Sequence, residues 1–299
     1  MADHLRATVL YGSGVVSIRD VRCRPCGADR HEEEVSLTDD IVFPRAGAFV
    51  RHDAAGEVFA DPSRVLFFNG GQGYRVTHPV DGGDDCTVFT FAQGVLHDAL
   101  GETDPAAVDR VGALFPRQDA ANDFRGFAAM LKLRAILRDG EPFGVRIEEA
   151  ALRVLAGAVD SLSRHCDRPL RRVRPATARV HRRTVFGARA FLIHSFHEPR
   201  TLSEIARAVY SSPFHLARMF ARETGSPIHK YLMNLRLRAA LERLADGVED
   251  LTRLALDLGF SSHSHFTDSF QKALGMPPSD FRRGLSVARL RKMSKNLKV

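Results

Sequence analysis

The feature that most constrains the fold of this chain is a repeat within its last third. Ala206 corresponds to Ala255 at an offset of 49 residues, and Phe220 corresponds to Phe270 at an offset of 50. The other matching pairs are Ser212 with Ser261 at 49, and Gly225 with Gly275, Pro227 with Pro277 and Tyr231 with Phe281 at 50. Each copy has the pattern of a short helix, a tight turn, a second helix and a glycine stop, which is typical of a helix-turn-helix unit. A repeated helical hairpin without DNA-binding function would also show such a period.

Capping residues mark where these helices begin and end. Residues 201–204, Thr-Leu-Ser-Glu, match a capping box. Ser212-Pro213 and Ser226-Pro227 each place a capping serine before a proline at the first helical position. Gly225 and Gly247 stand where helices should stop. The pattern predicts an all-helical block from about residue 179 to 283.

Charge is distributed unevenly along the chain. Residues 168–299 contain 25 Lys and Arg against 10 Asp and Glu, whereas residues 1–167 contain 18 against 26. Such asymmetry indicates that the C-terminal part binds a polyanion. Charge alone leaves duplex DNA, RNA and acidic lipids as alternatives.

The N-terminal part has a different pattern. From residue 5 to about 91, short clusters of β-branched and aromatic residues alternate with Gly and Pro turn signals, which favours a small barrel or sandwich. The clusters are residues 15–18, 40–43, 48–50, 57–59, 64–68 and 87–91. After about residue 95 the spacing of apolar residues becomes helical. Two apolar helix faces are expected, one of Phe124, Phe127, Ala128, Leu131 and Ala135, the other of Ile147, Ala151, Val154, Ala158 and Leu162.

The C-terminal repeat resembles the AraC/XylS family of transcription regulators. Residues 202–206 and 212–220 resemble the first motif of that family, and the second-motif signature is matched by residues 254–255, 259–261, 264–266, 270, 275, 277–278 and 281–282. The helix between the motifs also agrees, at Tyr231, Arg236 and Ala239-Ala240. The resemblance covers about one third of the chain. It implies two recognition helices that enter successive major-groove segments on one face of the DNA.

Position by position, the resemblance implies which side chains face the DNA. They are Phe214, Ala217 and Arg218 on the first recognition helix, and His263, Ser264, Thr267 and Asp268 on the second. Arg218 can donate to guanine O6 and N7 or to a phosphate. Leu216, Met219, Phe220, Phe266 and Phe270 are expected in the core.

Asp268 departs from the family, which commonly carries Arg at this position. A carboxylate cannot pair with a phosphate. It could accept from cytosine N4, or form an ion pair with Lys272 one helical turn later, and we favour the ion pair. The second motif is therefore expected to bind more weakly than the first.

The N-terminal half resembles, more loosely, the cupin-like effector-sensing domain of many family members. The resemblance lies in residues 47–49, 61–62 together with 65–68, and 74–79. It implies a ligand inside a small barrel and adjacent helices that pair two subunits. His78 invites a metal interpretation, but the His-x-His pair, Glu and distal His of a metal cupin are not found, so a structural polar contact is expected.

The cysteines do not form a disulfide pattern. They are Cys23, Cys26, Cys86 and Cys166. Cys23 and Cys26, with His31 nearby, are the one candidate metal or redox cluster, yet a single CxxC is weak support for zinc, which needs four convergent ligands. Ordinary strand-end cysteines are preferred, and no metal, cofactor or catalytic residue is expected.

Together these patterns predict an α+β chain: an N-terminal cupin-like β-barrel with a helical linker, then an all-α double helix-turn-helix domain. The expected parts are an effector-sensing domain over 1–95, a linker that could dimerise over 96–175, a DNA-binding domain over 176–285 and a basic tail over 286–299. The expected function is an effector-responsive, sequence-specific DNA-binding regulator.

The main alternative is an enzyme, either a metal cupin or a thiol-based DNA-repair protein, fused to the same DNA-binding module. A third possible class of function is a constitutive architectural protein that binds no ligand. Expected partners are double-stranded operator DNA, an unidentified small-molecule effector and a second copy of the chain, with RNA polymerase as a further candidate. No apolar stretch approaches the roughly 18–20 residues of a membrane span, and residues 1–10 do not resemble a signal peptide, so no membrane partner and a cytoplasmic location are expected.

Overall fold

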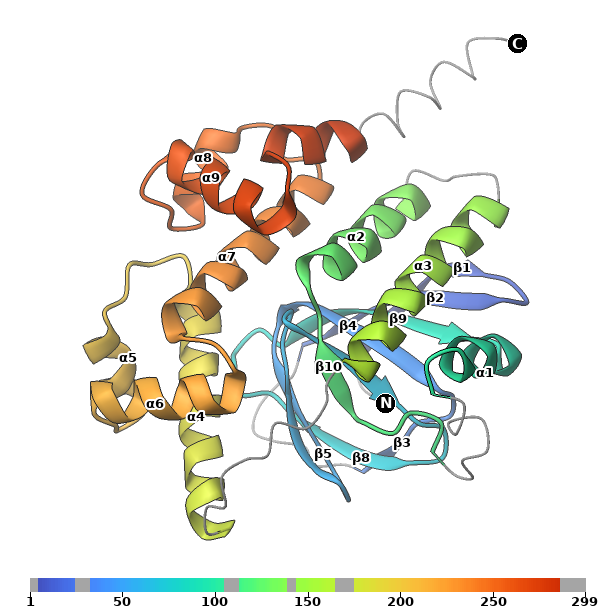
Figure 1. Ribbon diagram of the computed structural model, residues 1–299, viewed down its shortest axis with the longest axis horizontal. Coiled ribbons are helices and arrows are strands. Elements are labelled where there is room, and N and C mark those ends of the chain that lie inside the picture. Colours follow the sequence, from blue (N-terminus) through green and yellow to red (C-terminus); the bar gives the residue numbers. More distant parts are fainter. Residues whose placement is uncertain (1–4, 25–32, 105–112, 139–143, 165–174, 286–299) are drawn as a thin grey trace.

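The computed structural model describes residues 5–24, 33–104, 113–138, 144–164 and 175–285. An N-terminal part built on two β-sheets lies beside a C-terminal group of helices (Figure 1). No helix among the described residues is both long enough and apolar enough to cross a membrane.

The larger sheet has six strands in the order β1-β2-β9-β4-β7-β10, and the smaller has four in the order β3-β8-β5-β6. Their bounds are β1 Leu5–Gly12, β2 Val16–Cys23, β3 Glu34–Val35, β4 Asp40–Gly47, β5 Phe49–Asp53, β6 Gly56–Ala60, β7 Arg64–Phe68, β8 Gly73–Thr77, β9 Asp84–Phe91 and β10 Asp119–Ala121. Each strand pair is antiparallel. All six clusters that the sequence marked as β-like lie wholly or largely in strands.

The strands do not close into the expected barrel. β4 pairs with β7 only over residues 40–42 and then reaches Pro44, which has no N–H to donate to a neighbouring strand. A bulge follows in its pairing with β9, and Gly47 takes a positive φ of 71°. The chain then continues as β5 in the smaller sheet. Pro44 and Gly47 therefore turn the chain from one sheet to the other, and the described strands form two open sheets.

The predicted amphipathic helices are present. α1 spans Gln93–Gly101, α2 Phe124–Arg138 and α3 Gly144–Ser163. The whole predicted face of α3 is buried, and on α2 Phe127, Ala128 and Leu131 are buried while Phe124 and Ala135 are partly exposed. α2 and α3 pack against each other, and α3 also contacts β10, which adds to the sheet from beyond residue 95.

The C-terminal helices follow the predicted repeat. They are α4 Pro175–Ser195, α5 Leu202–Ala208, α6 Pro213–Thr224, α7 Ile228–Ala245, α8 Leu251–Asp257 and α9 His263–Leu274. α5 with α6 and α8 with α9 lie at opposite ends of α7 (Figure 1). α7 is thus the element that fixes how the two helix pairs are placed relative to each other.

Candidate nucleic-acid interface

Helices α5 and α6 begin and end where the sequence signals indicated. The predicted cap of the next helix is wrong, because Pro227, and not Ser226, stands at the N-cap of α7, and no side chain caps that helix. Thr201 accepts a hydrogen bond from the N–H of Glu204 at 3.2 Å, and Glu204 accepts one from the N–H of Thr201 at 2.7 Å, which completes the capping box. Ser212 caps α6 by accepting from the N–H of His215 at 3.2 Å. Gly225 ends α6 with a φ of 71°. These caps satisfy backbone groups that would otherwise be unpaired at the helix ends.

The second helix of the second unit is also capped by a serine, but this serine lies one position later than the sequence repeat indicated. Ser262, and not Ser261, caps α9, because the Ser262 hydroxyl accepts from the N–H of His265 at 3.1 Å. The extra residue of the second copy therefore precedes the cap, and Ser212 corresponds structurally to Ser262. Ser261 instead bonds its hydroxyl to Nδ1 of His265 at 3.0 Å.

One face of each second helix forms the core of its unit, as predicted. Leu216, Phe220, Phe266 and Phe270 have no exposed surface, and Met219 is 6% exposed. The Phe270 ring packs edge-on against Phe281, and Phe220 packs in the same way against Tyr231. Burial of these side chains fixes which face of α6 and α9 remains in solvent.

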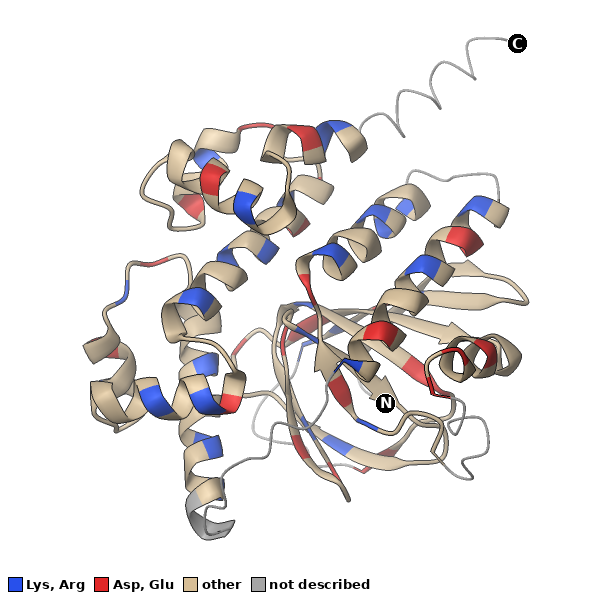
Figure 2. Ribbon diagram, viewed as in Figure 1, with Lys and Arg blue, Asp and Glu red and all other residues tan. Residues whose placement is uncertain are grey.

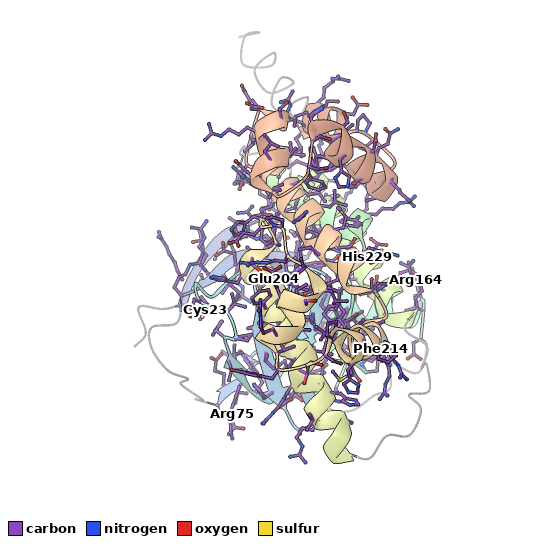
Figure 3. All side chains as sticks on the ribbon, turned by 90° about the vertical axis from the view of Figure 1, so that its left-hand side faces the viewer. Cys23, Arg75, Arg164, Glu204, Phe214 and His229 are labelled. Carbon is purple, nitrogen blue, oxygen red and sulfur yellow. The ribbon has the colours of Figure 1, made fainter. Side chains whose placement is uncertain are left out.

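On α6, the exposed face carries an aromatic ring beside a cation. The side chain of Phe214 is 71% exposed, and the guanidinium of Arg218 lies 5.6 Å from the centre of its ring. Ala217, the third predicted contact, is partly exposed, and His215 is exposed. Figure 3 shows Phe214 and His229, which directly follows Ile228 at the start of α7, on the same side of the molecule.

On α9, the predicted contacts divide into two groups. His263, Ser264 and Asp268 are exposed, whereas Thr267 is partly buried and its hydroxyl oxygen is enclosed without a hydrogen bond to any described group. Thr267 therefore exposes part of its surface to solvent, but its hydroxyl oxygen stays buried. The predicted ion pair between Asp268 and Lys272 is not formed, although the structure describes both side chains.

An arginine of α7 holds the turn between α8 and α9 in place. Arg236 donates to the carbonyl of Phe196 at 2.7 Å, of Gly259 at 2.6 Å and of Glu198 at 3.1 Å. Gly259 has a φ of 80°, and a Cβ there would lie 2.5 Å from the carbonyl oxygen of His197. Burial lowers the pKa of Arg236. Arg236 and Gly259 thus fix the second unit to the end of α4.

A buried ionic junction connects the helices to the sheets. Asp61, in the turn between β6 and β7, accepts from Arg189 of α4 and from the Tyr231 hydroxyl of α7. Burial acts to raise the pKa of Asp61, but the charge of Arg189 and the hydrogen bonds from Ser63 and Tyr231 outweigh it and hold that pKa below its ordinary value. The Arg189 guanidinium also lies 4.1 Å from the ring centre of Phe59.

A second junction lies further along α7. Glu242 pairs with Arg45 of β4 and with Arg134 of α2, the latter at 3.2 Å, and Arg134 Nε reaches Asp20 of β2 at 2.8 Å. Arg238 donates to the carbonyl of Asn122, and burial lowers its pKa to about 10. Burial raises the pKa of Glu242, and the two arginines oppose this effect.

The sequence interpretation missed both junctions. The available signal was the alternation of leucine and arginine over residues 235–238, all four of which are buried. A helix with buried residues on all sides is enclosed by neighbouring elements on more than one face.

A cleft of about 430 Å³ lies between the sheets and the helices α4 and α7. Its wall combines apolar side chains with arginines and carboxylates. Val80, Ile193, Phe196, Leu235, Arg24, Arg45 and Arg238 are among the lining residues. The volume lies within the range of small-molecule sites.

The predicted cysteine cluster is only partly described. Cys26 and His31 lie outside the described residues, as do the basic segment 168–174 and the tail 286–299. Cys23, at the end of β2, is a partly buried free thiol, and Cys86 is a buried one. Burial, and then the negative charge of Asp84, raise the pKa of the Cys86 thiol well above its ordinary value, which is the opposite of what a nucleophilic cysteine requires.

Lysine and arginine positions recur along the ribbons of α4, α6 and α7 (Figure 2). Exposed members of this set are Arg182, Arg183, Arg218, Arg222 and Lys230, and Arg207 of the neighbouring α5 is exposed as well. The helices that carry the exposed Phe214 face are therefore also basic, which suits contact with a nucleic-acid backbone.

Comparison with known proteins agrees with this geometry. Residues 205–284 match the model of a helix-turn-helix domain family. The chain is 35% identical over 94 residues to the HTH-type transcriptional regulator YobQ of Bacillus subtilis (strain 168), covering 31% of this chain and 39% of YobQ. It is 34% identical over 119 residues to the bifunctional transcriptional activator/DNA repair enzyme Ada of Escherichia coli (strain K12), covering 39% of this chain and 33% of Ada. The matches thus span about a third of the length of these relatives.

Among solved structures, an AraC-type DNA-binding domain protein of Chromobacterium violaceum matches with 26% identity and a TM-score of 0.34. That match covers 35% of this chain and 94% of the other.

Proposed function

Because residues 205–284 of this chain belong to the AraC/XylS family of helix-turn-helix regulators, we propose that the whole protein is a sequence-specific transcription regulator that binds operator DNA and responds to a small-molecule effector. The observation that carries the proposal is the pair of capped second helices, α6 and α9, placed at opposite ends of one buried helix, α7. Two reading helices held by one rigid spacer suit contact with successive segments of a major groove.

On the DNA side, the first unit makes the stronger contact. Arg218 supplies a planar cationic donor, and Phe214 supplies an apolar surface for a thymine methyl. In the second unit, His263 and Ser264 supply exposed polar groups, and Asp268 places a negative charge on the same exposed surface. Arg207, Arg222 and Lys230 are candidates for phosphate contacts, which fix position and add affinity without selecting a sequence.

On the sensing side, the two open N-terminal sheets form the effector-sensing domain, and the effector binds in the cleft against α4 and α7. Apolar residues beside arginines in the cleft wall suit a small molecule with an apolar body and a polar end. An occupant there contacts the sheets and the DNA-binding helices together, so its binding energy favours one arrangement of the two.

The protein acts by binding and not by catalysis. A thiol-based repair activity needs a reactive cysteine, and of the two cysteines that the structure describes, Cys86 is unsuited to that chemistry because it is buried and its pKa is raised. The active form is a dimer of two chains, for which α3 offers the exposed apolar residues Val145 and Leu152, seven positions apart on one helix. RNA polymerase is a further partner for a regulator of this kind.

Selection of bound fragments from a random duplex pool with purified full-length protein tests the function. We expect enrichment of one motif with two half-sites about one helical turn of DNA apart. The variant Arg218→Ala with Ser264→Ala should lose this enrichment, while Arg75→Ala, an exposed arginine of β8, should keep it. A well-folded wild-type protein that enriches no motif overturns the proposal.

A further inference from the structure

Three side chains with different metal-ligand chemistry meet at one end of the β2–β9 ladder. Cys23 is the last residue of β2 and lies directly opposite Asp84, the first residue of β9. His78 follows β8, and its Nε2 lies 2.8 Å from Oδ1 of Asp84. One ligand atom from each of Cys23, His78 and Asp84 lies within 4.8 Å of those of the other two.

We propose that Cys23, His78 and Asp84 supply three of the four ligands of a thiophilic divalent ion, zinc above all, with water as the fourth. Zinc takes thiolate, imidazole and carboxylate ligands at about 2.0–2.3 Å, which places tetrahedral ligand atoms roughly 3.3–3.8 Å apart. Small side-chain rotations therefore bring the three atoms from their present spacing onto one ion. This set differs from the Cys23, Cys26 and His31 cluster considered from the sequence, because the strand register selects Asp84 and His78.

Charge balance supports the assignment. A thiolate, a carboxylate and a neutral imidazole around a dication make a neutral site, which suits the buried position of Asp84 and the partly buried positions of the other two. The neighbouring cations are already paired, Arg24 with Asp85 at 2.7 Å and Arg45 with Glu242.

Surrounding groups hold the ligands in place. Cys86 donates its S–H to Oδ2 of Asp84 at 3.1 Å, which leaves Oδ1 facing His78. Arg24 donates to the backbone carbonyls of Cys23 and Asp84, each at 3.0 Å, and so ties the two strand ends together. Metal sites depend on such orienting partners almost as strongly as on the ligands themselves.

The proposed metal site lies next to the cleft between the sheets and the DNA-binding helices. The turn between His78 and Asp84 forms part of the cleft wall that faces α4 and α7. An ion that joins both ends of this turn to β2 restricts the movement of that wall. We therefore assign the site a regulatory role, and this role rests on the proposed DNA-binding function, whereas the metal site does not. In Figure 3, Cys23 and Phe214 lie on opposite sides of the view, so the ion would not touch the reading helix.

Cobalt and zinc titrations of the reduced full-length protein test the site. We expect one equivalent of Co²⁺ to give a thiolate-to-cobalt charge-transfer band with the visible bands of a tetrahedral ion, and one equivalent of Zn²⁺ to remove them. Cys23→Ser should abolish the charge-transfer band. His78→Gln and Asp84→Asn should each lower zinc affinity, measured against a chromophoric chelator, by more than about tenfold, since loss of an orienting partner alone costs about 10–100-fold.

Matched variants make the test decisive. Asp81→Asn removes an exposed carboxylate from the same turn and should leave zinc affinity unchanged. If Cys26→Ser removes zinc binding while His78→Gln and Asp84→Asn do not, the ion belongs to the Cys-x-x-Cys pair and the proposed site is wrong. Wild-type protein without a thiolate–cobalt band also overturns it. The metal measurement needs no DNA, so it stands whether or not the regulator function does.

Discussion

Asp61 of the N-terminal part and Arg189 of α4 form a buried ion pair, with Nη2 of Arg189 2.5 Å and Nε 3.2 Å from Oδ2 of Asp61. The side chain of Asp61 is fully enclosed and that of Arg189 is 10% exposed. Removing two charges from water is costly, and their attraction offsets that cost only in good geometry. The pair therefore favours one particular arrangement of the sheets against the DNA-binding helices, which a surface pair would not do.

Removal of the Asp61 charge should destabilise the protein strongly. Asp61→Asn leaves Arg189 buried without a counter-ion, and we expect a loss of about 3–5 kcal/mol in the free energy of unfolding. Denaturant titration monitored by circular dichroism measures it. Asp257→Asn is the matched control, because its pair with Arg243 is exposed on both sides and should contribute about 0–1 kcal/mol. Equal effects of the two substitutions would contradict a special role for the buried pair.

The same pair predicts how stability depends on pH. The pKa of Asp61 is lower in the folded chain than its ordinary value of 3.8. The stabilisation is therefore complete above the unfolded pKa and is lost as the pH falls through the folded pKa. The difference in unfolding free energy between wild type and Asp61→Asn should be constant from about pH 5 to 7 and shrink below about pH 4. A difference that grows on acidification would show that the sign is wrong.

Glycine at position 259 should be required for a steric reason. A Cβ at Gly259 would lie 2.5 Å from a backbone oxygen, whereas Gly225, with a similar φ, has no atom within 4 Å of its virtual Cβ. Gly225→Ala should cost only the left-handed backbone penalty of about 1–2 kcal/mol, and Gly259→Ala should cost clearly more. Thermal unfolding of the two variants compares them. Equal losses would indicate that the turn can move away from His197.

Local patterns predicted much of this structure, because caps, helix faces and turn glycines depend on nearby residues. Ser212, Gly225 and the face of α3 are examples. The strand pattern left a barrel and a two-sheet sandwich open, and the barrel that we expected was wrong, because the outcome depends on where β4 leaves one sheet at Pro44. β10 was missed since three residues with one buried side chain give no periodic signal.

In the candidate site, too, local sequence patterns predicted some features and missed those that depend on residues far apart in sequence. Exposure of Phe214 and Arg218 agreed with expectation, because helix periodicity fixes the buried face. The junction at Asp61 and the cluster at His78 join residues far apart in sequence, and only the strand and helix packing brings them together.

A fragment of residues 174–299 should bind duplex DNA without the N-terminal part. It keeps every helix of the repeat and α4, which packs on α5 and α6. Its net positive charge releases counterions from DNA, so the logarithm of affinity should fall linearly with the logarithm of salt concentration. A gel-shift titration at several salt concentrations measures this. A folded fragment without preference for duplex DNA would contradict the expectation.

Arg218 should contribute more to binding than any other predicted contact. Arg218→Ala should weaken binding by about 1–3 kcal/mol and relax preference at one base pair if the contact is to guanine. If the contact is to phosphate, the loss should be similar on all sequences and the salt dependence shallower. Fluorescence anisotropy on the selected operator and its single-base variants separates the two. Arg75→Ala, in the N-terminal sheet, should bind as wild type does.

Asp268 should oppose binding or have no effect on it. The exposed carboxylate forms no ion pair with Lys272, so it keeps its full charge on the surface that faces DNA in the proposed complex. Asp268→Ala should therefore leave operator affinity unchanged or raise it, most clearly at low salt, because repulsion between like charges is least screened there. Asp257→Ala, which removes an exposed carboxylate of α8 paired with Arg243, is the control for a general change of charge. The affinity of both variants is measured on one operator at fixed salt, after circular dichroism establishes that each is folded. A selective loss at one C·G position would show that Asp268 accepts from cytosine N4. In that case the second motif would contribute to sequence recognition as directly as the first.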